Sequence, residues 1–194
     1  AADNQLADRA AFRQFMAGLG FRNLRGHLLA DDDDISTITP VDPADKDTLK
    51  GEYIPYTGRA LSWHTDGYYH EADNPIRSMT LYCARQASMG GESAFMDPDI
   101  IYIRLRDQNP DFIRALMRPD AMTVPANIQG GSEIRPARTG PVFMKDPVSG
   151  YLSMRYTART VSIEWPDDAQ MIAARTALEA LLSDTDGDPM IVRR

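Results

Sequence analysis

Cysteine is almost absent from this sequence: Cys83 is the only one among 194 residues. An intrachain disulfide is therefore excluded, and chains without disulfides are typical of the reducing cytosol. We expect Cys83 to lie in a buried strand, because its neighbours Met79, Leu81 and Tyr82 are large and apolar. A targeting pattern of basic and then apolar residues is also missing from the N-terminus, so we expect a cytoplasmic location.

Long apolar runs and blocks of basic residues are missing as well. No apolar stretch approaches the roughly 20 residues that a membrane span needs, so no membrane association is expected. The net charge of −7 predicts that nucleic acids and anionic membranes are not the main partners. The run Asp31–Asp34 lacks the spaced ligands and the glutamate of a calcium loop, so we interpret it as a solvated loop. An apolar fraction of 43% indicates a globular domain.

Helical periodicity appears in four places. Residues 5–19 place Phe12, Phe15, Met16 and Leu19 on one face and end at two glycines. The pairs Asp97-Pro98 and Asn109-Pro110 each combine an N-cap residue with proline at the first helical position, so they predict two further helices. The fourth helix begins near Pro166 and presents an apolar face, which consists of Ile172, Leu178, Leu181 and Leu182.

Strand-like segments, separated by glycine-rich turns, dominate the chain after residue 58. They cover residues 61–69, 77–85, 93–96 and 151–162, and the chain from 189 onward. Residues 118–150 are expected to be extended, with turns at Gly130-Gly131 and at residues 148–150. We therefore predict one domain over residues 1–194 that is mainly β with inserted helices. Residues 1–58 supply a helix and loops, and residues 59–194 supply an antiparallel sandwich or barrel.

Histidine is scarce, since the sequence has only His27, His64 and His70. His64 lies two residues before Asp66 in a predicted strand, so both side chains point to the same face. One imidazole and one carboxylate on one face suit a divalent metal. A second histidine would complete the two-His-one-carboxylate site of non-haem iron oxygenases. A hydrogen-bonded pair on a sheet surface is the alternative interpretation.

The sequence around this pair, residues 61–70, resembles the taurine catabolism dioxygenase (TauD/TfdA) family of Fe(II)- and 2-oxoglutarate-dependent oxygenases. The run from Leu81 to Asp97, with Gly90-Gly91-Glu92-Ser93 inside it, resembles the family in order and spacing. Residues 154–159 resemble a strand that the family places near its pocket. The resemblance covers roughly residues 55–194.

The resemblance implies a double-stranded β-helix, which is a distorted jelly roll, with extra helices. It implies that His64 and Asp66 bind Fe(II), and that Ser93 donates a hydrogen bond to the 2-oxoglutarate carboxylate. A hydroxyl after a Gly-Gly turn suits an anion, although it is equally a common turn residue. The implied reaction is hydroxylation of a small organic substrate by O₂, with succinate and CO₂ as co-products.

Three further side chains are candidates for substrate or cofactor contacts. Tyr68 shares the face of His64 and Asp66 if the strand continues, so it either lines the substrate pocket or packs against the sheet. Arg155 and Arg159 lie four residues apart on a predicted strand and share a face. They bind 2-oxoglutarate or an anionic substrate, or else form salt bridges on a solvated face.

The sequence departs from the family pattern in one respect. The second iron histidine of the family, and the arginine that binds 2-oxoglutarate, lie C-terminal to the matched stretch and are not found before Arg194. His70 is separated from His64 by about 20 Å of extended chain, so it reaches the same ion only if the chain folds back after Gly67.

We therefore expect the last strands of the jelly roll to be missing from this sequence. It is then a fragment of an active enzyme, a chain completed by another chain in a homo-oligomer, or an inactive relative. Two other functions stay open. One is a non-catalytic jelly-roll module that binds a metal or a partner, and the other is a metal-dependent hydrolase.

Overall fold

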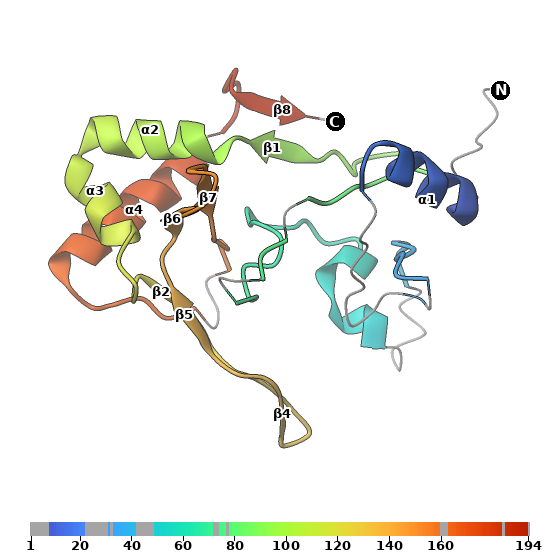
Figure 1. The fold of residues 1–194 in the computed structure, drawn as a ribbon, viewed down its shortest axis with the longest axis horizontal. Coiled ribbons are helices and arrows are strands. Elements are labelled where there is room, and N and C mark those ends of the chain that lie inside the picture. The colour runs from blue at the N-terminus through green and yellow to red at the C-terminus, as the bar shows by residue number, and fades with distance from the viewer. Residues whose placement is uncertain are drawn as a thin grey trace. The chain divides into compact units, whose positions relative to one another are not determined.

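The chain folds into two compact units, each described by itself below (Figure 1). The computed structural model describes residues 8–21, 31, 33–41, 49–71, 74–76, 78–159, 163–183 and 185–193. The first unit comprises Ala1–Leu61 and Thr80–Gly91, and the second comprises Ser62–Met79 and Glu92–Arg194. The boundary after Leu61 lies close to the predicted change at residue 58. The predicted single domain over residues 1–194 stays a prediction.

The first unit contains the predicted N-terminal helix, which is confirmed as α1 (Arg9–Gly18). The Asp8 carboxylate caps it by accepting a hydrogen bond from a first-turn amide at 2.8 Å. Met16 is buried, whereas Phe15 and Leu19 are 50% and 59% exposed. The expected apolar face is therefore only partly used, because α1 lies at the surface of a small unit. Two short 3₁₀ turns, η2 (Leu49–Glu52) and η3 (Ile54–Tyr56), complete this unit.

The acidic run is more ordered than the predicted solvated loop. Arg9 of α1 donates to Asp31 at 2.9 Å and to Asp33 at 2.6 Å. These hydrogen bonds hold the pKa of both carboxyl groups below the ordinary range. An arginine from the helix thus compensates the like charges of the run, which sequence proximity alone does not predict.

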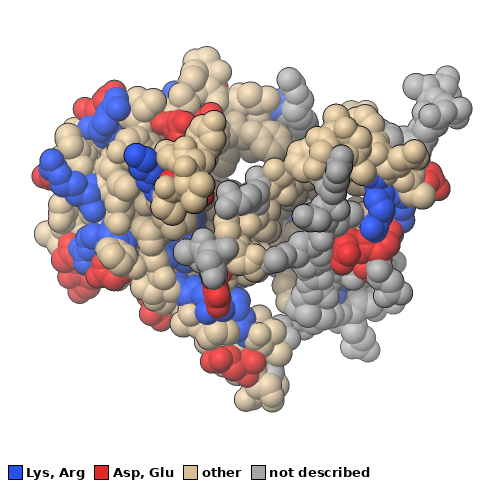
Figure 2. Space-filling view, in the orientation of Figure 1, with Lys and Arg blue, Asp and Glu red and all other residues tan. Residues whose placement is uncertain are grey.

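The second unit contains three helices that pack against one another (Figure 1). They are α2 (Pro98–Gln108), α3 (Pro110–Leu116) and α4 (Ala169–Ser183). The predicted caps are confirmed, because the Asp97 and Asn109 side chains accept backbone amides at 2.9 and 3.0 Å. Figure 2 shows basic and acidic side chains interspersed on the face in view, which agrees with ion pairs such as that between Arg118 and Asp168.

The strands of this unit are short and form two-stranded antiparallel sheets. β1 (Ala94–Met96) pairs with β8 (Ile191–Arg193), and β2 (Met122–Val124) pairs with β5 (Arg138–Gly140). β3 (Asn127–Gln129) and β4 (Ser132–Arg135) form a hairpin across Gly130-Gly131, and β6 (Phe143–Lys145) pairs with β7 (Leu152–Met154). Among the described residues these pairs do not close into a jelly roll or barrel. By number of elements, the described chain thus consists mostly of short strands with a few helices, which agrees with the predicted mainly β class.

Two predicted strands are much shorter than expected, and one is wrong. Residues 61–69 contain only an isolated bridge at His64, and residues 151–162 contain β7 and a bridge at Thr157. The described part of 77–85 has no strand, and Cys83 is exposed rather than buried. Leu81 beside it is 56% exposed. Strand propensity depends on a neighbouring strand to pair with, and the described chain offers none to this apolar segment.

The hydrophobic core lies in the second unit, between the helices and the strands. Its fully buried members come from α2, α3, β2, β6 and α4, and they include Leu105, Leu116, Met122, Phe143 and Leu178. The face of α4 is confirmed at Leu178 and Leu182, whereas Ile172 is 50% exposed. No helix in the described part of the chain has the length and apolar character of a membrane span.

Replacing one core leucine tests this packing. Leu178→Ala should lower the free energy of unfolding by about 2–5 kcal/mol, because it leaves a cavity in a closely packed core. Ile172→Ala, on the same helix, should cost less than about 1 kcal/mol, since half of that side chain already faces solvent. Urea denaturation measures both. Equal losses would contradict the assigned buried face of α4.

Candidate metal centre

A short contact between two segments far apart in the sequence holds His64 in place. His64 forms an antiparallel bridge with Thr157. Two backbone hydrogen bonds flank this bridge, from Thr65 N to Tyr156 O at 2.9 Å and from Ala158 N to Trp63 O at 2.8 Å. The Thr65 hydroxyl also accepts from Tyr156 N at 3.0 Å. The position of the imidazole is therefore set by the chain that continues from β7.

A turn directly after Asp66 ends the extended segment. Gly67 has a φ of +67°, and the His70 amide donates to the Gly67 carbonyl at 2.7 Å. A Cβ atom at Gly67 would lie 2.9 Å from Ile76 Cγ1, so this turn needs glycine for both conformation and space. The chain thus turns after Gly67, which is the position at which His70 needed a turn to approach the same ion.

The two predicted ligands lie side by side. His64 Nε2 is 3.7 Å from Asp66 Oδ1, and each side chain is about one-third exposed, at 32% and 35%. His64 Nδ1 lies 2.7 Å from the Ser62 carbonyl, which fixes Nδ1 as the protonated nitrogen in a neutral ring. Nε2 then presents a lone pair beside the carboxylate.

This geometry fits a metal ion. A first-row divalent ion binds imidazole nitrogen and carboxylate oxygen at roughly 2.0–2.2 Å, so two adjacent ligand atoms of a facial site lie roughly 3 Å apart. His64 Nε2 and Asp66 Oδ1 are 3.7 Å apart, so a small side-chain rotation brings both atoms onto one ion. The imidazole, the carboxylate and the orienting carbonyl are the groups that suit Fe(II).

The part of the chain that the structure describes places no third protein ligand near the pair. Among the described residues no group of three His, Cys, Asp or Glu side chains could hold a metal ion. Despite the turn, the His70 ring is directed elsewhere, with Nδ1 3.3 Å from the Asn74 carbonyl. His27 lies outside the described residues. The described residues therefore supply two of the three protein ligands of a facial site, His64 and Asp66, from one segment.

Arg155 contacts this segment, but it is buried among backbone carbonyls, whereas an anionic ligand or a surface salt bridge was expected. It is only 8% exposed, and its guanidinium donates to five backbone carbonyls. The acceptors are those of Tyr68, Met122, Arg138, Gly140 and Pro141. All five N–H groups of an arginine are engaged in this way. Burial lowers the pKa of Arg155. We infer that it holds the backbone together.

Its contact with Tyr68 ties Arg155 to the metal pair. Arg155 Nη1 donates to the Tyr68 carbonyl at 3.3 Å, two residues after Asp66, while the amide of Arg155 donates to Val142 O at 2.7 Å. The segment that carries His64 and Asp66 is thus fixed on one side by Tyr156 and on the other by Arg155.

The remaining predicted site residues are spread over the second unit. Tyr68 packs against the core and contacts Tyr69 edge to face, with 5.2 Å between the ring centroids. Its predicted place in the pocket required the extended segment to continue past Asp66, but that segment ends at the turn at Gly67. Ser93 is half-buried directly before β1. Arg159 is exposed, whereas Arg155 is buried, so the two arginines do not share one environment. Within the described chain no hydrogen bond or ion pair joins Ser93 or Arg159 to His64 or Asp66.

The sequence analysis missed the residues that orient the site. The Ser62 carbonyl and the Thr65 hydroxyl act through backbone contacts, for which no sequence motif exists. Arg138 was also missed, although it pairs with Glu71 at 2.6 Å a few residues after Asp66. A weak signal was its place three residues after Arg135 in an acidic chain.

Comparison with known proteins identifies the family. The sequence matches the taurine catabolism dioxygenase TauD, TfdA family over residues 3–187, which is nearly the whole chain. The protein therefore belongs to the TauD/TfdA family, as the motif around His64 and Asp66 indicated.

Two curated relatives bear the same name. The chain is 30% identical over 145 residues to a uridine-5'-phosphate dioxygenase of Streptomyces sp, covering 73% of this chain and 49% of the relative. It is 34% identical over 128 residues to a uridine-5'-phosphate dioxygenase of Amycolatopsis sp, covering 66% of this chain and 44% of the relative. The chain thus spans about half the length of the curated relatives it matches.

Removing either ligand tests the metal pair. His64→Ala and Asp66→Ala should each weaken Fe(II) binding by more than the roughly 10–100-fold that loss of an orienting partner costs. His70→Ala should keep the metal affinity, because that ring faces the Asn74 carbonyl. Anaerobic equilibrium dialysis followed by metal analysis measures all three variants. Unchanged iron content in both His64→Ala and Asp66→Ala would refute the assignment.

Replacing Arg155 distinguishes a structural role from a ligand-binding one. Arg155→Met should lower the free energy of unfolding by about 2–4 kcal/mol, because several buried carbonyls lose a charged donor. Arg155→Lys should recover part of this loss with its three donors, and the exposed Arg159→Met should change stability by less than about 0.5 kcal/mol. A stable Arg155→Met variant that binds 2-oxoglutarate poorly would instead favour direct contact with the cosubstrate.

Proposed function

We propose that this protein is an Fe(II)- and 2-oxoglutarate-dependent dioxygenase that hydroxylates a small organic substrate. The observation that carries the proposal is the pair formed by His64 Nε2 and Asp66 Oδ1, 3.7 Å apart, with the imidazole oriented by Ser62. The family match over residues 3–187 supports the same class. When bound, Fe(II) and 2-oxoglutarate supply the oxidation of a substrate C–H bond by O₂, coupled to release of succinate and CO₂.

The residues of the pair have separate roles in this proposal. His64 binds the metal as a neutral ligand through Nε2 while Nδ1–H donates to the Ser62 carbonyl. Asp66 binds through its carboxylate and offsets part of the metal charge. The bridge to Thr157 and the turn at Gly67 hold both side chains, so little ordering remains when metal binds. In this proposal the third protein ligand is a residue other than the described ones.

The other predicted contacts stay proposals. Ser93 would donate its hydroxyl to a carboxylate of 2-oxoglutarate, Arg159 is an exposed cation open to an anionic ligand, and Tyr68 would contact substrate through its edge. A cytoplasmic location and a homo-oligomer also stay predictions.

For the substrate, we propose a nucleoside 5'-monophosphate as the first class to test. Both curated relatives are named for uridine 5'-phosphate, and they are 30% and 34% identical to this chain over the matched regions. An anionic substrate is also one of the ligands that the sequence suggested for Arg159.

Coupled turnover tests this function. With Fe(II), 2-oxoglutarate and O₂, uridine 5'-phosphate should stimulate succinate formation and O₂ uptake, and His64→Ala should abolish both. Without O₂, Fe(II) and 2-oxoglutarate should give a weak visible charge-transfer band. Tight iron binding with neither the band nor succinate would overturn the oxygenase proposal and favour a non-catalytic metal-binding module.

A further inference from the structure

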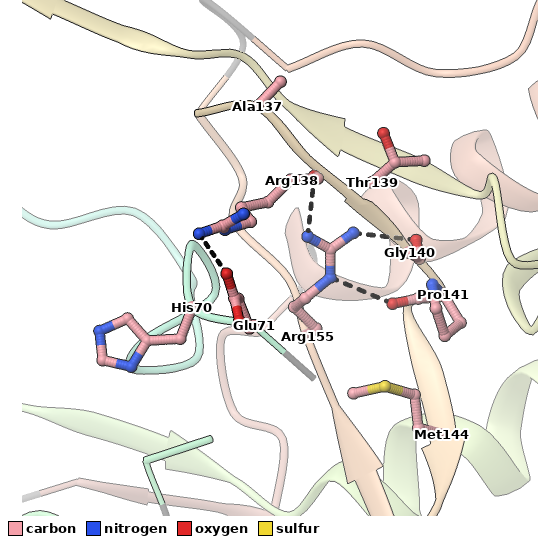
Figure 3. A pocket seen from close by; sticks show the side chains of 9 residues that line it. All are labelled: His70, Glu71, Ala137, Arg138, Thr139, Gly140, Pro141, Met144 and Arg155. Carbon is pink, nitrogen blue, oxygen red and sulfur yellow. Dashed lines mark hydrogen bonds and ion pairs between the residues drawn. The ribbon is translucent and has the colours of Figure 1, made fainter. Parts of the chain in front are cut away.

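A cavity of about 260 Å³ lies beside the segment that carries the metal pair (Figure 3). The strand β5, the chain that follows it, and the turn after Gly67 form most of its walls. The lining residues are His70, Glu71, Ala137, Arg138, Thr139, Gly140, Pro141, Met144 and Arg155. Its volume is slightly below the roughly 300–1,000 Å³ of sites for whole drug-sized ligands, so it suits one functional group and its immediate neighbours.

The charges of this cavity favour an anion. Arg138 and Arg155 contribute two positive charges, and Glu71 contributes the single carboxylate among the lining residues. Within the described chain no carboxylate lies within 4 Å of Arg155, whose donors all go to uncharged carbonyls. A neutral acceptor does not cancel a guanidinium charge, so the lining keeps a net positive charge in partly desolvated surroundings.

Arg138 has hydrogen-bonding capacity that the protein does not use. Its Nη2 pairs with Glu71 Oε1 at 2.6 Å, whereas its Nε is buried and has no partner. The Nε and Nη2 groups form one edge of the guanidinium, and this edge matches two oxygens of a phosphate or carboxylate. Glu71 satisfies half of that edge, and a buried donor left without an acceptor is unfavourable.

The two partners differ in how firmly they are held. Figure 3 shows the Arg138 guanidinium and the Glu71 carboxylate pointing toward one another, with Arg155 directed at the backbone around Gly140. Arg138 lies in β5, opposite Val124 of β2, and its own carbonyl accepts from Arg155 at 3.3 Å. The Glu71 side chain is 55% exposed. The Glu71 carboxylate is therefore the less constrained partner, so an incoming anion would compete with it for Arg138.

The positive charge of Arg138 also affects a neighbouring arginine, Arg135. Burial, and then the charge of Arg138, lower the pKa of Arg135, which lies at the end of β4. Arg138 thus faces an additional positive charge across the short link between β4 and β5.

The cavity is within reach of the metal pair. His70 follows Asp66 by four residues, which span at most about 14 Å of extended chain. The turn closed by the hydrogen bond from His70 N to Gly67 O shortens that distance. The cavity wall at His70 is thus separated from Asp66 by less than about 14 Å.

We propose that this cavity is the phosphate subsite for the substrate, in which the phosphate of a nucleoside 5'-monophosphate displaces Glu71 and binds the Nε–Nη2 edge of Arg138. This inference rests on the proposed function, because it assigns the substrate class of the same site. It concerns binding alone, so it is testable without turnover.

Calorimetric titration of the metal-free protein with uridine 5'-phosphate, uridine and 2-oxoglutarate tests the subsite. The wild type should bind the nucleotide about 10–100-fold more tightly than uridine, the range expected of charge-assisted hydrogen bonds. Arg138→Gln should remove this difference, Arg138→Lys should reduce it, and Glu71→Gln should increase it by removing the competitor. Arg106→Gln is the matched control, since Arg106 pairs with Asp107 on α2 far along the chain from the cavity. Thermal melting establishes that each variant is folded.

Two results would overturn the inference. One is that the wild type binds uridine 5'-phosphate no more tightly than uridine, or that a folded Arg138→Gln variant keeps the preference for the nucleotide. The other is an Arg138→Gln variant that loses affinity for 2-oxoglutarate while it keeps that for the nucleotide, which would assign the cavity to the cosubstrate. Nucleotide binding through Arg138 without succinate formation would contradict the proposed function alone. Turnover that is independent of Arg138 would contradict the subsite alone.

Discussion

The contact between residues 63–65 and residues 156–158 is the constraint on which the site depends. Two backbone hydrogen bonds, at 2.9 and 2.8 Å, and the Thr65 hydroxyl join these segments across more than 90 positions of the chain. Backbone pairing fixes where each Cβ lies, so it sets the direction of the His64 imidazole. Tyr156, at the other side of the contact, belongs to the hydrophobic core, and burial raises the pKa of its phenol to about 12. The ligand pair is thus attached to the hydrophobic core through Tyr156.

The turn at Gly67 and the guanidinium of Arg155 complete this support. The turn stops the extended segment immediately after Asp66, and Arg155 binds the carbonyl that follows it. The same guanidinium binds carbonyls of β2 and β5, and β5 carries Arg138. One buried residue therefore connects the metal pair with the cavity that we assign to phosphate. A site of this kind needs support from distant segments, because ligands must be held within a fraction of an ångström.

The sequence predicted the local features well and the long-range ones poorly. The caps Asp97 and Asn109 were found because a capping residue followed by proline has a local physical signature. His64 and Asp66 were predicted to share a face because their spacing is short, and the structure places them 3.7 Å apart, while their role as metal ligands stays a prediction. The strand around Cys83 was wrong, since its apolar residues have no described strand to pair with. Arg155 was expected on a shared face with Arg159, but its burial depends on five carbonyls from three separate segments, which no spacing encodes.

Crystals grown with ferrous ion, or with Mn(II) in its place, allow the most direct measurement: the position of the metal by anomalous scattering. Our account predicts a single peak that lies roughly 2.0–2.2 Å from both the distal nitrogen of His64 and a carboxylate oxygen of Asp66. A peak that contacts neither His64 nor Asp66 would contradict the assignment of these two side chains as metal ligands.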